Sequence, residues 1–161
     1  MRIDAKKYCL LTAVTTAALL LQTLASQASA GEVEYIVTPD SAPLGLPFSD
    51  AVIFDNLLVM SGQLGVNPAN FRLVDGGIEA ETRQIFSNMT ALLSSHDATL
   101  DSIVKCTVMI DDIDEWPAFN TIYLSYFTNH KPARSALGAD GLALGAAVEL
   151  ECWAYLSDSP N

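Results

Sequence analysis

Residues 103–110 read Ile-Val-Lys-Cys-Thr-Val-Met-Ile, and from Val104 onward apolar and polar positions alternate. A period of two is typical of a β-strand that is covered on one face only. The pattern predicts two opposite sets of side chains. The covered set is Val104, Cys106, Val108 and Ile110, and the uncovered set is Lys105, Thr107 and Met109.

On both sides of this strand the spacing of the apolar residues becomes that of an α-helix. Upstream, from Ile78 onward, apolar residues recur at the i, i+4, i+7 and i+8 positions of one amphipathic helix. These residues are Ile85, Met89, Leu92 and Leu93. Downstream, Asp112 or Asp114 can cap a second helix that has Pro117 in its first turn. Its apolar stripe consists of Trp116, Phe119, Tyr123, Tyr126 and Phe127.

The remaining segments predict five further strands and no repeat. They span Glu32–Thr38, Ser49–Phe54, Leu57–Ser61, Ala133–Ala139 and Ala147–Leu156. Asp55-Asn56 is a hairpin signal between two of them, and Gly62 to Gly77 is expected to be a loop. The order βββαβαββ predicts an α+β domain over residues 31–161, a mixed sheet with both helices on one face.

The last strand predicts what covers the other face of the sheet. Val148, Leu150, Cys152 and Ala154 alternate with Glu149, Glu151, Trp153 and Tyr155. The first set suits the helix side. Charges and large aromatic rings on the second set favour an interface with another subunit.

The N-terminus is typical of a targeting segment. Arg2, Lys6 and Lys7 precede an uncharged stretch from Leu10 to Leu21, and Ala28-Ser29-Ala30 forms a small-x-small cleavage site. The stretch is shorter than a membrane-spanning helix needs, so a membrane anchor is the weaker interpretation. We expect a signal peptide at residues 1–30, cleavage after Ala30, and an exported, periplasmic protein.

Charge excludes two classes of partner. Residues 31–161 carry five Lys and Arg against eighteen Asp and Glu, a net charge of −13. Such a surface repels nucleic acid and anionic lipid, so we expect neither nucleic-acid binding nor membrane binding after cleavage.

Cysteine and histidine usage argues against a metal site. Cys106 and Cys152 lie in separate predicted strands, away from His96 and His130. Export would permit a disulfide, but each cysteine fits an apolar slot, so we expect buried free thiols. Both histidines are expected to be exposed at helix ends. Asn88 is expected to be a buried structural amide, although Asn88-Met89-Thr90 is also a glycosylation sequon.

Two residues stand out as candidates for chemistry. Arg134 follows Pro132 at the head of a strand, and its planar guanidinium can grip a carboxylate with two parallel hydrogen bonds. Glu149 lies between Val148 and Leu150 and can orient a water molecule. Either could instead form a structural ion pair, and Glu151 is a competing carboxylate on the same face as Glu149.

Four motifs together resemble the RidA/YjgF family, also known as endoribonuclease L-PSP proteins. They are Pro132-Ala133-Arg134-Ser135, Val148-Glu149-Leu150-Glu151, Ser61-Gly62-Gln63 and Pro47-Phe48-Ser49-Asp50-Ala51-Val52. The resemblance runs from about Ala42 to Tyr155 and includes Asn88 and Asn120. It implies a chorismate-mutase-like barrel, a homotrimer with clefts between subunits.

The resemblance also implies roles for individual residues. Arg134 anchors the substrate carboxylate, Glu149 positions water, and Ser61, Asn120, Phe48 and Ala136 line the ligand site. Phe48 stands where a tyrosine is frequent in the family, and Ala136 where a cysteine is frequent. Ser61 could instead serve only a tight turn, and Asn120 could brace its helix.

These roles imply an enzyme that needs no cofactor and no metal. It would hydrolyse reactive 2-imino or 2-enamino acids to 2-oxo acids and ammonia. A non-catalytic binder of small carboxylated metabolites is the alternative, and an endoribonuclease is the weakest hypothesis because of the charge.

Overall fold

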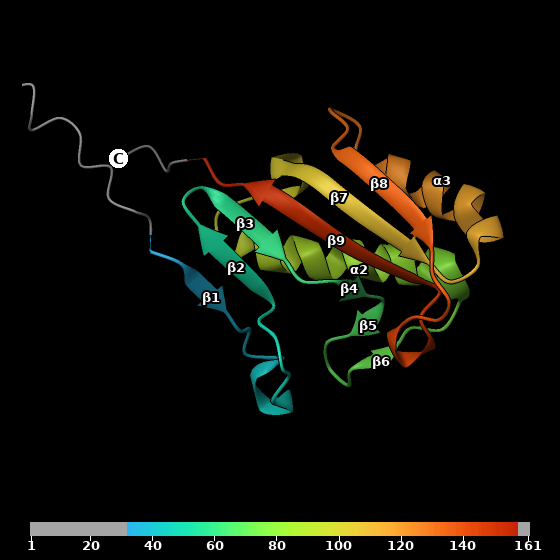
Figure 1. The fold of residues 1–161 in the computed structure, drawn as a ribbon, viewed down its shortest axis with the longest axis horizontal. Helices are drawn as coiled ribbons and strands as arrows, with labels where there is room; N and C mark the ends of the chain where they lie inside the picture. Colours follow the sequence, from blue (N-terminus) through green and yellow to red (C-terminus); the bar gives the residue numbers. More distant parts are fainter. Residues whose placement is uncertain (1–31, 158–161) are drawn as a thin grey trace, which may run out of the picture. The chain divides into compact units, whose positions relative to one another are not determined.

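The computed structural model describes residues 32–157, so the predicted signal peptide and its cleavage site lie outside the described residues. The described part belongs to one compact unit, and it confirms the order βββαβαββ for the main elements (Figure 1). Their bounds are β1 Glu34–Ile36, β2 Ala51–Phe54, β3 Leu57–Met60, α2 Gly77–Ser94, β7 Ile103–Ile110, α3 Trp116–Tyr126, β8 Ala133–Gly138 and β9 Val148–Tyr155.

The segment expected to be a loop also contains three short strands. β4 (Gln63–Leu64) pairs with β9, while β5 (Val66–Asn67) and β6 (Arg72–Leu73) form a separate two-stranded sheet. Each has only two residues, too few for any alternation to show in the sequence.

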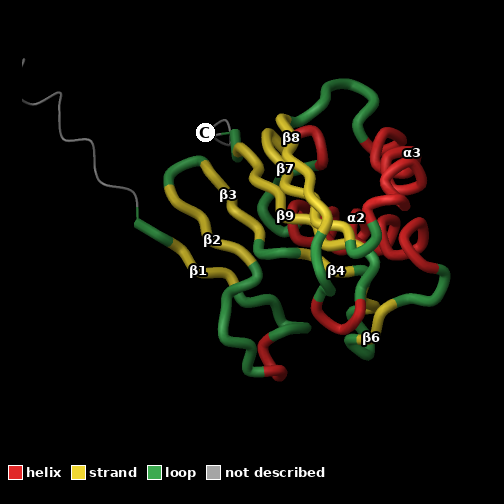
Figure 2. Tube along the Cα trace, turned by 45° about the vertical axis from the view of Figure 1, so that its right-hand side comes forward, coloured by secondary structure: helices red, strands yellow, loops and turns green. Residues whose placement is uncertain are grey.

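The main sheet is mixed and runs in the order β1-β2-β3-β9-β7-β8 (Figure 2). Neighbouring strands are antiparallel except β7 and β8, which are parallel. Parallel neighbours need a crossover connection, and α3 provides it. β8 lies at the edge of the sheet, and residues 127–132 connect it to the end of α3.

Both helices cover one face of the sheet, as expected (Figure 1). In β9 every second residue from Val148 to Ala154 is fully buried, as are Ile85, Met89 and Leu93 of α2. In α3 the buried residues are Phe119, Ile122 and Tyr123, and Phe127 follows directly after them. This shared core holds the sheet and both helices together.

The prediction that Val104 faces the core is wrong. Val104 is 44% exposed, whereas Ile103 is fully buried. A shift in the pairing of β7 with β9 between Ile103 and Lys105 explains the difference, because an extra residue in one strand reverses the alternation beyond it.

The prediction of two free thiols is also wrong, because Cys106 and Cys152 form a disulfide. The two residues lie directly opposite each other in the antiparallel pair β7–β9, with Cα atoms 4.1 Å apart. Alternation within each strand correctly placed both on the helix side. It could not reveal that these two strands are neighbours in this register.

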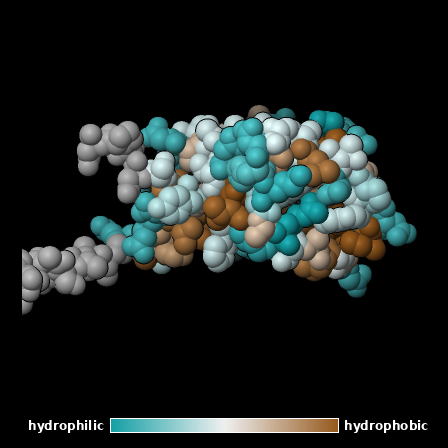
Figure 3. Space-filling view, turned by 90° about the horizontal axis from the view of Figure 1, so that it is seen from above, coloured by the Kyte–Doolittle hydropathy of each residue, from teal (hydrophilic) through white to brown (hydrophobic). Residues whose placement is uncertain are grey.

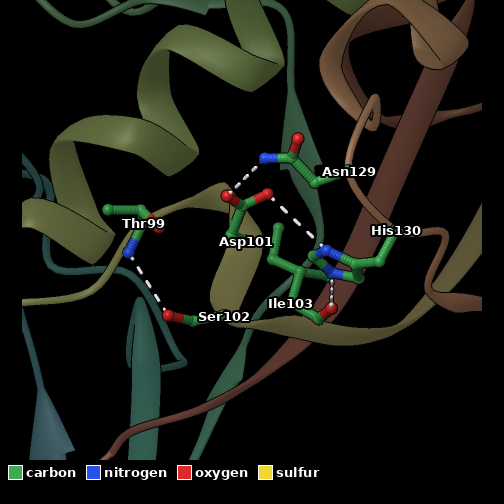
Figure 4. A network of polar contacts seen from close by, with 6 residues as sticks. All are labelled: Thr99, Asp101, Ser102, Ile103, Asn129 and His130. Atoms are coloured by element: carbon green, nitrogen blue, oxygen red, sulfur yellow. Dashed lines mark hydrogen bonds and ion pairs between the residues drawn. The ribbon is translucent and has the colours of Figure 1, made fainter.

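The histidines differ from the expectation in part. His130 is exposed, but its ring lies 3.6 Å from the carboxylate of Asp101 and 3.2 Å from the carbonyl oxygen of Ile103 (Figure 4). Asn129 donates to the other oxygen of Asp101. This network fastens the segment between α3 and β8 to the start of β7. His96, after α2, is partly buried.

Candidate functional site

Arg134 of β8 is held by residues of α3. Its Nη1 donates a hydrogen bond of 2.9 Å to Oδ1 of Asn120. Its guanidinium carbon lies 4.6 Å from the ring centroid of Trp116 and 4.7 Å from that of Tyr123. Positions 116, 120 and 123 fall on one side of a helix, so α3 presents all three groups to the arginine at once.

No carboxylate neutralises Arg134 in the part of the chain that the structure describes. Across residues 32–157, the ion pair found is that of His130 with Asp101. Within this range Arg134 therefore does not form the structural ion pair with an acidic neighbour that was the alternative to a role in ligand binding. The guanidinium remains a cation whose protein partners are neutral.

Glu149 of β9 lies over the turn between β3 and β4. A Cβ atom added to Gly62 would come within 1.8 Å of its Oε1 atom. Burial raises the pKa of the Glu149 carboxyl, and the nearby charge of Glu151 raises it further. Glu151 itself accepts a hydrogen bond from Trp153 Nε1 at 3.0 Å. Among the described residues no hydrogen bond to the Glu149 carboxylate is present, so it is free to hold water or a ligand.

Glu81 fixes the chain immediately before Glu149. This carboxylate of α2 is only 6% exposed and accepts hydrogen bonds from the backbone N–H groups of Ala147, at 2.9 Å, and Val148. Burial raises its pKa, the two hydrogen bonds lower it, and the charge of Glu115 raises it, with a net increase. The sequence analysis missed Glu81 because its partners are backbone groups far along the chain.

Arg134 and Glu149 do not meet within one chain. Arg134 pairs with Cys106 and lies on the helix side of the sheet, since directly paired residues share a face. Glu149 pairs with Met109 and Leu64, and it points to the opposite side. The sheet itself therefore separates the two groups.

Of the other four predicted ligand residues, two lie near Arg134 and one lies near Glu149. Asn120 lies beside Arg134, and the exposed Ala136 follows Arg134 by two residues on the same side of β8. Ser61 adjoins Gly62, but its hydroxyl donates to the carbonyl oxygen of Ser49 at 2.6 Å. Phe48 is 55% exposed.

Three contact residues were missed as site residues by the sequence analysis. Trp116 and Tyr123 were taken only as core positions of a helical stripe. The signal that could have found them is their spacing of four and three residues from Asn120. Gly62 was quoted within its motif without a role of its own, because its importance depends on the contact with Glu149.

Asn88 is a structural amide, as predicted, but it is only partly buried. Its Nδ2 donates to the carbonyl oxygens of Leu64 and Val66, which ties α2 to β4 and β5.

The structure offers few other sites among residues 32–157. In this range no three His, Cys, Asp or Glu side chains gather in a way that could hold a metal ion. None of the helices described is both long enough and apolar enough to cross a membrane.

Comparison with known proteins agrees with the fold and the motifs. A model of the family described as Endoribonuclease L-PSP matches residues 40–156. The chain belongs to the RidA/YjgF family. A RidA/YjgF relative from goat (Capra hircus), named 2-iminobutanoate/2-iminopropanoate deaminase, is 37% identical over 120 residues, which cover 74% of this chain and 88% of the goat protein.

Solved structures of the RidA/YjgF family have the same fold. YyfA from Yersinia pestis, described as a protein of unknown function of the conserved Rid family, matches with a TM-score of 0.71 at 36% identity. That match covers 78% of this chain and 100% of YyfA. The yjgF gene product of E. coli matches with a TM-score of 0.68 at 29% identity, over 76% of this chain and 98% of that protein.

Proposed function

We propose that the protein hydrolyses reactive 2-imino and 2-enamino acids to 2-oxo acids and ammonia. The observation that carries the proposal is the Arg134 guanidinium, a partly buried cation whose partners among residues 32–157 are an amide and two aromatic rings, with no carboxylate among them. A carboxylate of the ligand would neutralise the Arg134 guanidinium and accept charge-assisted hydrogen bonds from it. The deaminase names of several relatives support the same reaction class.

In the proposed reaction Glu149 acts on water. An enamine first tautomerises to its imine, and Arg134 holds the carboxylate of the imine. Glu149 orients a water molecule and takes up one of its protons as the oxygen adds to the imine carbon. The electron pair of the C=N π bond passes to nitrogen, which takes that proton back from Glu149 and gives a carbinolamine. Glu149 then accepts the proton of the new hydroxyl group and passes it to the nitrogen as the C–N bond breaks, so that a carbonyl forms and ammonia leaves with the bonding electron pair. A carboxyl whose pKa is raised is well matched to these proton transfers, which contribute about 10²- to 10⁴-fold. The imine carbon is already electrophilic, so the reaction needs no cofactor.

We infer that the site lies between chains of a homotrimer. One small ligand cannot contact both Arg134 and Glu149 of the same chain, because they lie on opposite faces of the sheet. It can contact both if the β8 edge of one chain approaches the open sheet face of another. That face carries Trp153, 38% exposed, and Tyr155, 51% exposed. Seen from above the view of Figure 1, the molecule also shows apolar patches among its polar residues (Figure 3). Light scattering that gives a stable monomer would contradict the inference.

The disulfide supports export. Cys106 and Cys152, the two cysteines outside residues 1–30, are bonded to each other, and disulfides persist mainly in oxidising compartments. We therefore propose that residues 1–30 direct the chain to the periplasm and are removed after Ala30. Intact-mass analysis of protein from outside the cytoplasm would show a chain that begins at Gly31. A longer, membrane-bound chain would contradict the proposal.

A non-catalytic binder of small carboxylates is the alternative function. It has some support, because Phe48 and Ala136 provide no polar group and the Ser61 hydroxyl is occupied by Ser49. Turnover distinguishes the two functions, since a binder would take up 2-oxo acids without accelerating imine hydrolysis.

The test compares two variants of the mature protein. Arg134→Ala should lose both 2-oxobutanoate binding and turnover of freshly generated 2-aminoacrylate. Glu149→Gln should retain binding and lose turnover by about 10²-fold or more. Arg83→Ala and Glu79→Gln remove exposed charges of the same types from α2 and serve as controls.

Two results would contradict the proposal. Turnover by Glu149→Gln at the parent rate would exclude the role of Glu149 in catalysis. Normal binding of 2-oxobutanoate by a folded Arg134→Ala would exclude the anchor and with it the whole site.

A further inference from the structure

The contacts of Arg134 have an unusual chemical composition for so acidic a protein. Eighteen Asp and Glu lie outside residues 1–30, yet the structure places two aromatic rings and an amide oxygen around this guanidinium. The first ring belongs to Trp116 at the start of α3, and the second to Tyr123 two turns later. Arg134 therefore lies over one continuous face of a single helix.

The two rings are themselves held in place. Phe119 is fully buried and lies 5.6 Å from the Trp116 ring and 5.5 Å from the Tyr123 ring, between centroids. Tyr123 also packs against Phe86 of α2 and against Phe127. Tyr123 is thus part of the core and Trp116 packs against the core, so both rings offer Arg134 a well-supported surface.

Aromatic partners leave the guanidinium available in a way that an acidic partner would not. The faces of aromatic rings attract a cation through their quadrupole. They offer no oxygen acceptor to the five N–H groups, which lie in the plane of the guanidinium. Asn120 accepts one of these groups, and within residues 32–157 it is the acceptor found for the guanidinium, which leaves most of the donors to a ligand. A protein carboxylate at the same place would compete directly with a carboxylate ligand.

We propose that Trp116 and Tyr123 are positioning residues that hold the Arg134 guanidinium, uncommitted to any protein acid, for the carboxylate of the ligand. The inference rests on the proposed function and adds two residues to its site. Neither residue touches the reacting atoms. Their effect is on how tightly the carboxylate is bound, and not on the chemical step at Glu149.

The first experiment separates the face of the ring from its bulk. Trp116→Leu removes the aromatic face, whereas Trp116→Phe retains one. Trp116→Leu should raise both the Kd for 2-oxobutanoate and the KM for 2-aminoacrylate by about 3- to 30-fold. Its kcat should change by less than about twofold, because the interaction is the same in the ground state and the transition state. Trp116→Phe should restore most of the affinity.

Tyr126→Leu is the matched control. Tyr126 is a partly buried ring of the same helix, and the ring contact found for it is with Phe86, at 4.2 Å between centroids. Its replacement should lower the Tm without changing the Kd. If Trp116→Leu also lowers the Tm and leaves the Kd at the parent value, the role of Trp116 is only structural and the proposal is wrong.

A second experiment tests the contact between Trp116 and Arg134 in a protein that keeps both Trp116 and Tyr123. The sequence has two tryptophans, Trp116 and Trp153, so Trp153→Phe leaves Trp116 as the single indole emitter. Added 2-oxobutanoate should shift the emission of this variant, and the shift should vanish when Arg134→Ala is combined with it. Binding without any shift in emission would contradict the proposal.

Failure of the positioning role and failure of the proposed function can be told apart. If Arg134→Ala no longer binds 2-oxobutanoate while Trp116→Leu binds it normally, the proposed function stands and the positioning role of Trp116 is excluded. If Arg134→Ala binds it normally, the proposed function itself fails.

Discussion

The Glu149 carboxylate occupies the space that a side chain at position 62 would require. A Cβ atom on Gly62 would lie 1.8 Å from Oε1 and 2.8 Å from Cδ of Glu149. Both distances are far inside van der Waals contact. The glycine in Ser61-Gly62-Gln63 is therefore needed for the position of the carboxylate and not for a special backbone angle.

Gly62→Ala should displace Glu149 and reduce kcat by about tenfold or more, since positioning is lost while the base is still present. Binding of 2-oxobutanoate should change much less, because in the proposed site Arg134, and not Glu149, holds the carboxylate. Steady-state kinetics and calorimetric titration measure the two quantities.

Gly138→Ala is the control for Gly62→Ala. A Cβ atom there would lie 3.4 Å from the nearest atom, in the side chain of Ile113, so little has to move. This variant should keep the parent kcat. A Gly62→Ala protein with parent kinetics would show that the Glu149 carboxylate need not lie over Gly62.

The sequence was sufficient wherever local periodicity determined the structure. The two helices, β7 and the buried face of β9 all follow from patterns within one segment, because burial on one side imposes a period of two or of about 3.6. Arg134, Asn120 and Glu149 were found through family motifs. Their division between the two faces of the sheet required the strand register.

Contacts between segments could not be predicted in the same way. The Cys106–Cys152 bond depends on which strands are neighbours, and the contact of Trp116 with Arg134 depends on where α3 lies relative to β8. The burial of Ile103 in place of Val104 depends on a pairing shift between two strands. None of these contacts between segments changes the spacing of apolar and polar residues within one segment, so the sequence pattern does not reveal them.

The disulfide leads to a prediction about thiols and stability. The mature protein, denatured without reductant, should show no free thiol, and it should show two after reduction. The bond closes a loop of 46 residues, for which loss of chain entropy in the unfolded state gives about 4 kcal/mol of stabilisation. Reduction should therefore lower the free energy of unfolding by a similar amount.

A variant without both cysteines controls for effects of the reductant other than cleavage of the disulfide. The double variant Cys106→Ala, Cys152→Ala should unfold at lower urea concentration than the oxidised parent and should not respond to reductant. Two reactive thiols in protein that has not been exposed to reductant would contradict the disulfide.

Glu81 leads to a prediction about pH. Burial raises its pKa in the folded protein, so the folded state binds more protons than the unfolded chain between the ordinary and the raised pKa. Stability should therefore fall as the pH rises through this interval, and Glu149 acts in the same direction. Glu81→Gln should make this fall less steep.

Urea unfolding at several values between about pH 4 and pH 7 measures the slope. Glu79→Gln removes an exposed carboxylate from the first turn of the same helix and should keep the parent slope. An unchanged slope in Glu81→Gln would mean that this carboxyl does not contribute to the pH dependence of stability.

Tyr123 leads to a prediction that separates its ring from its hydroxyl. The residue is 3% exposed, and its hydroxyl is the buried side-chain polar atom that has no hydrogen-bond partner among the described residues. A buried, unpaired hydroxyl costs free energy, about 1–3 kcal/mol in mutational series. Tyr123→Phe removes that hydroxyl and retains the ring that contacts Arg134.

Tyr123→Phe should therefore be at least as stable as the parent protein and should bind 2-oxobutanoate with the parent Kd. Tyr123→Leu, which removes the aromatic face as well, should raise the Kd by about 3- to 30-fold, as expected for the loss of a cation–π partner. Thermal unfolding and calorimetric titration of both variants provide the comparison. A Tyr123→Phe protein that folds normally but binds 2-oxobutanoate weakly would show that the hydroxyl, and not the ring, supports Arg134.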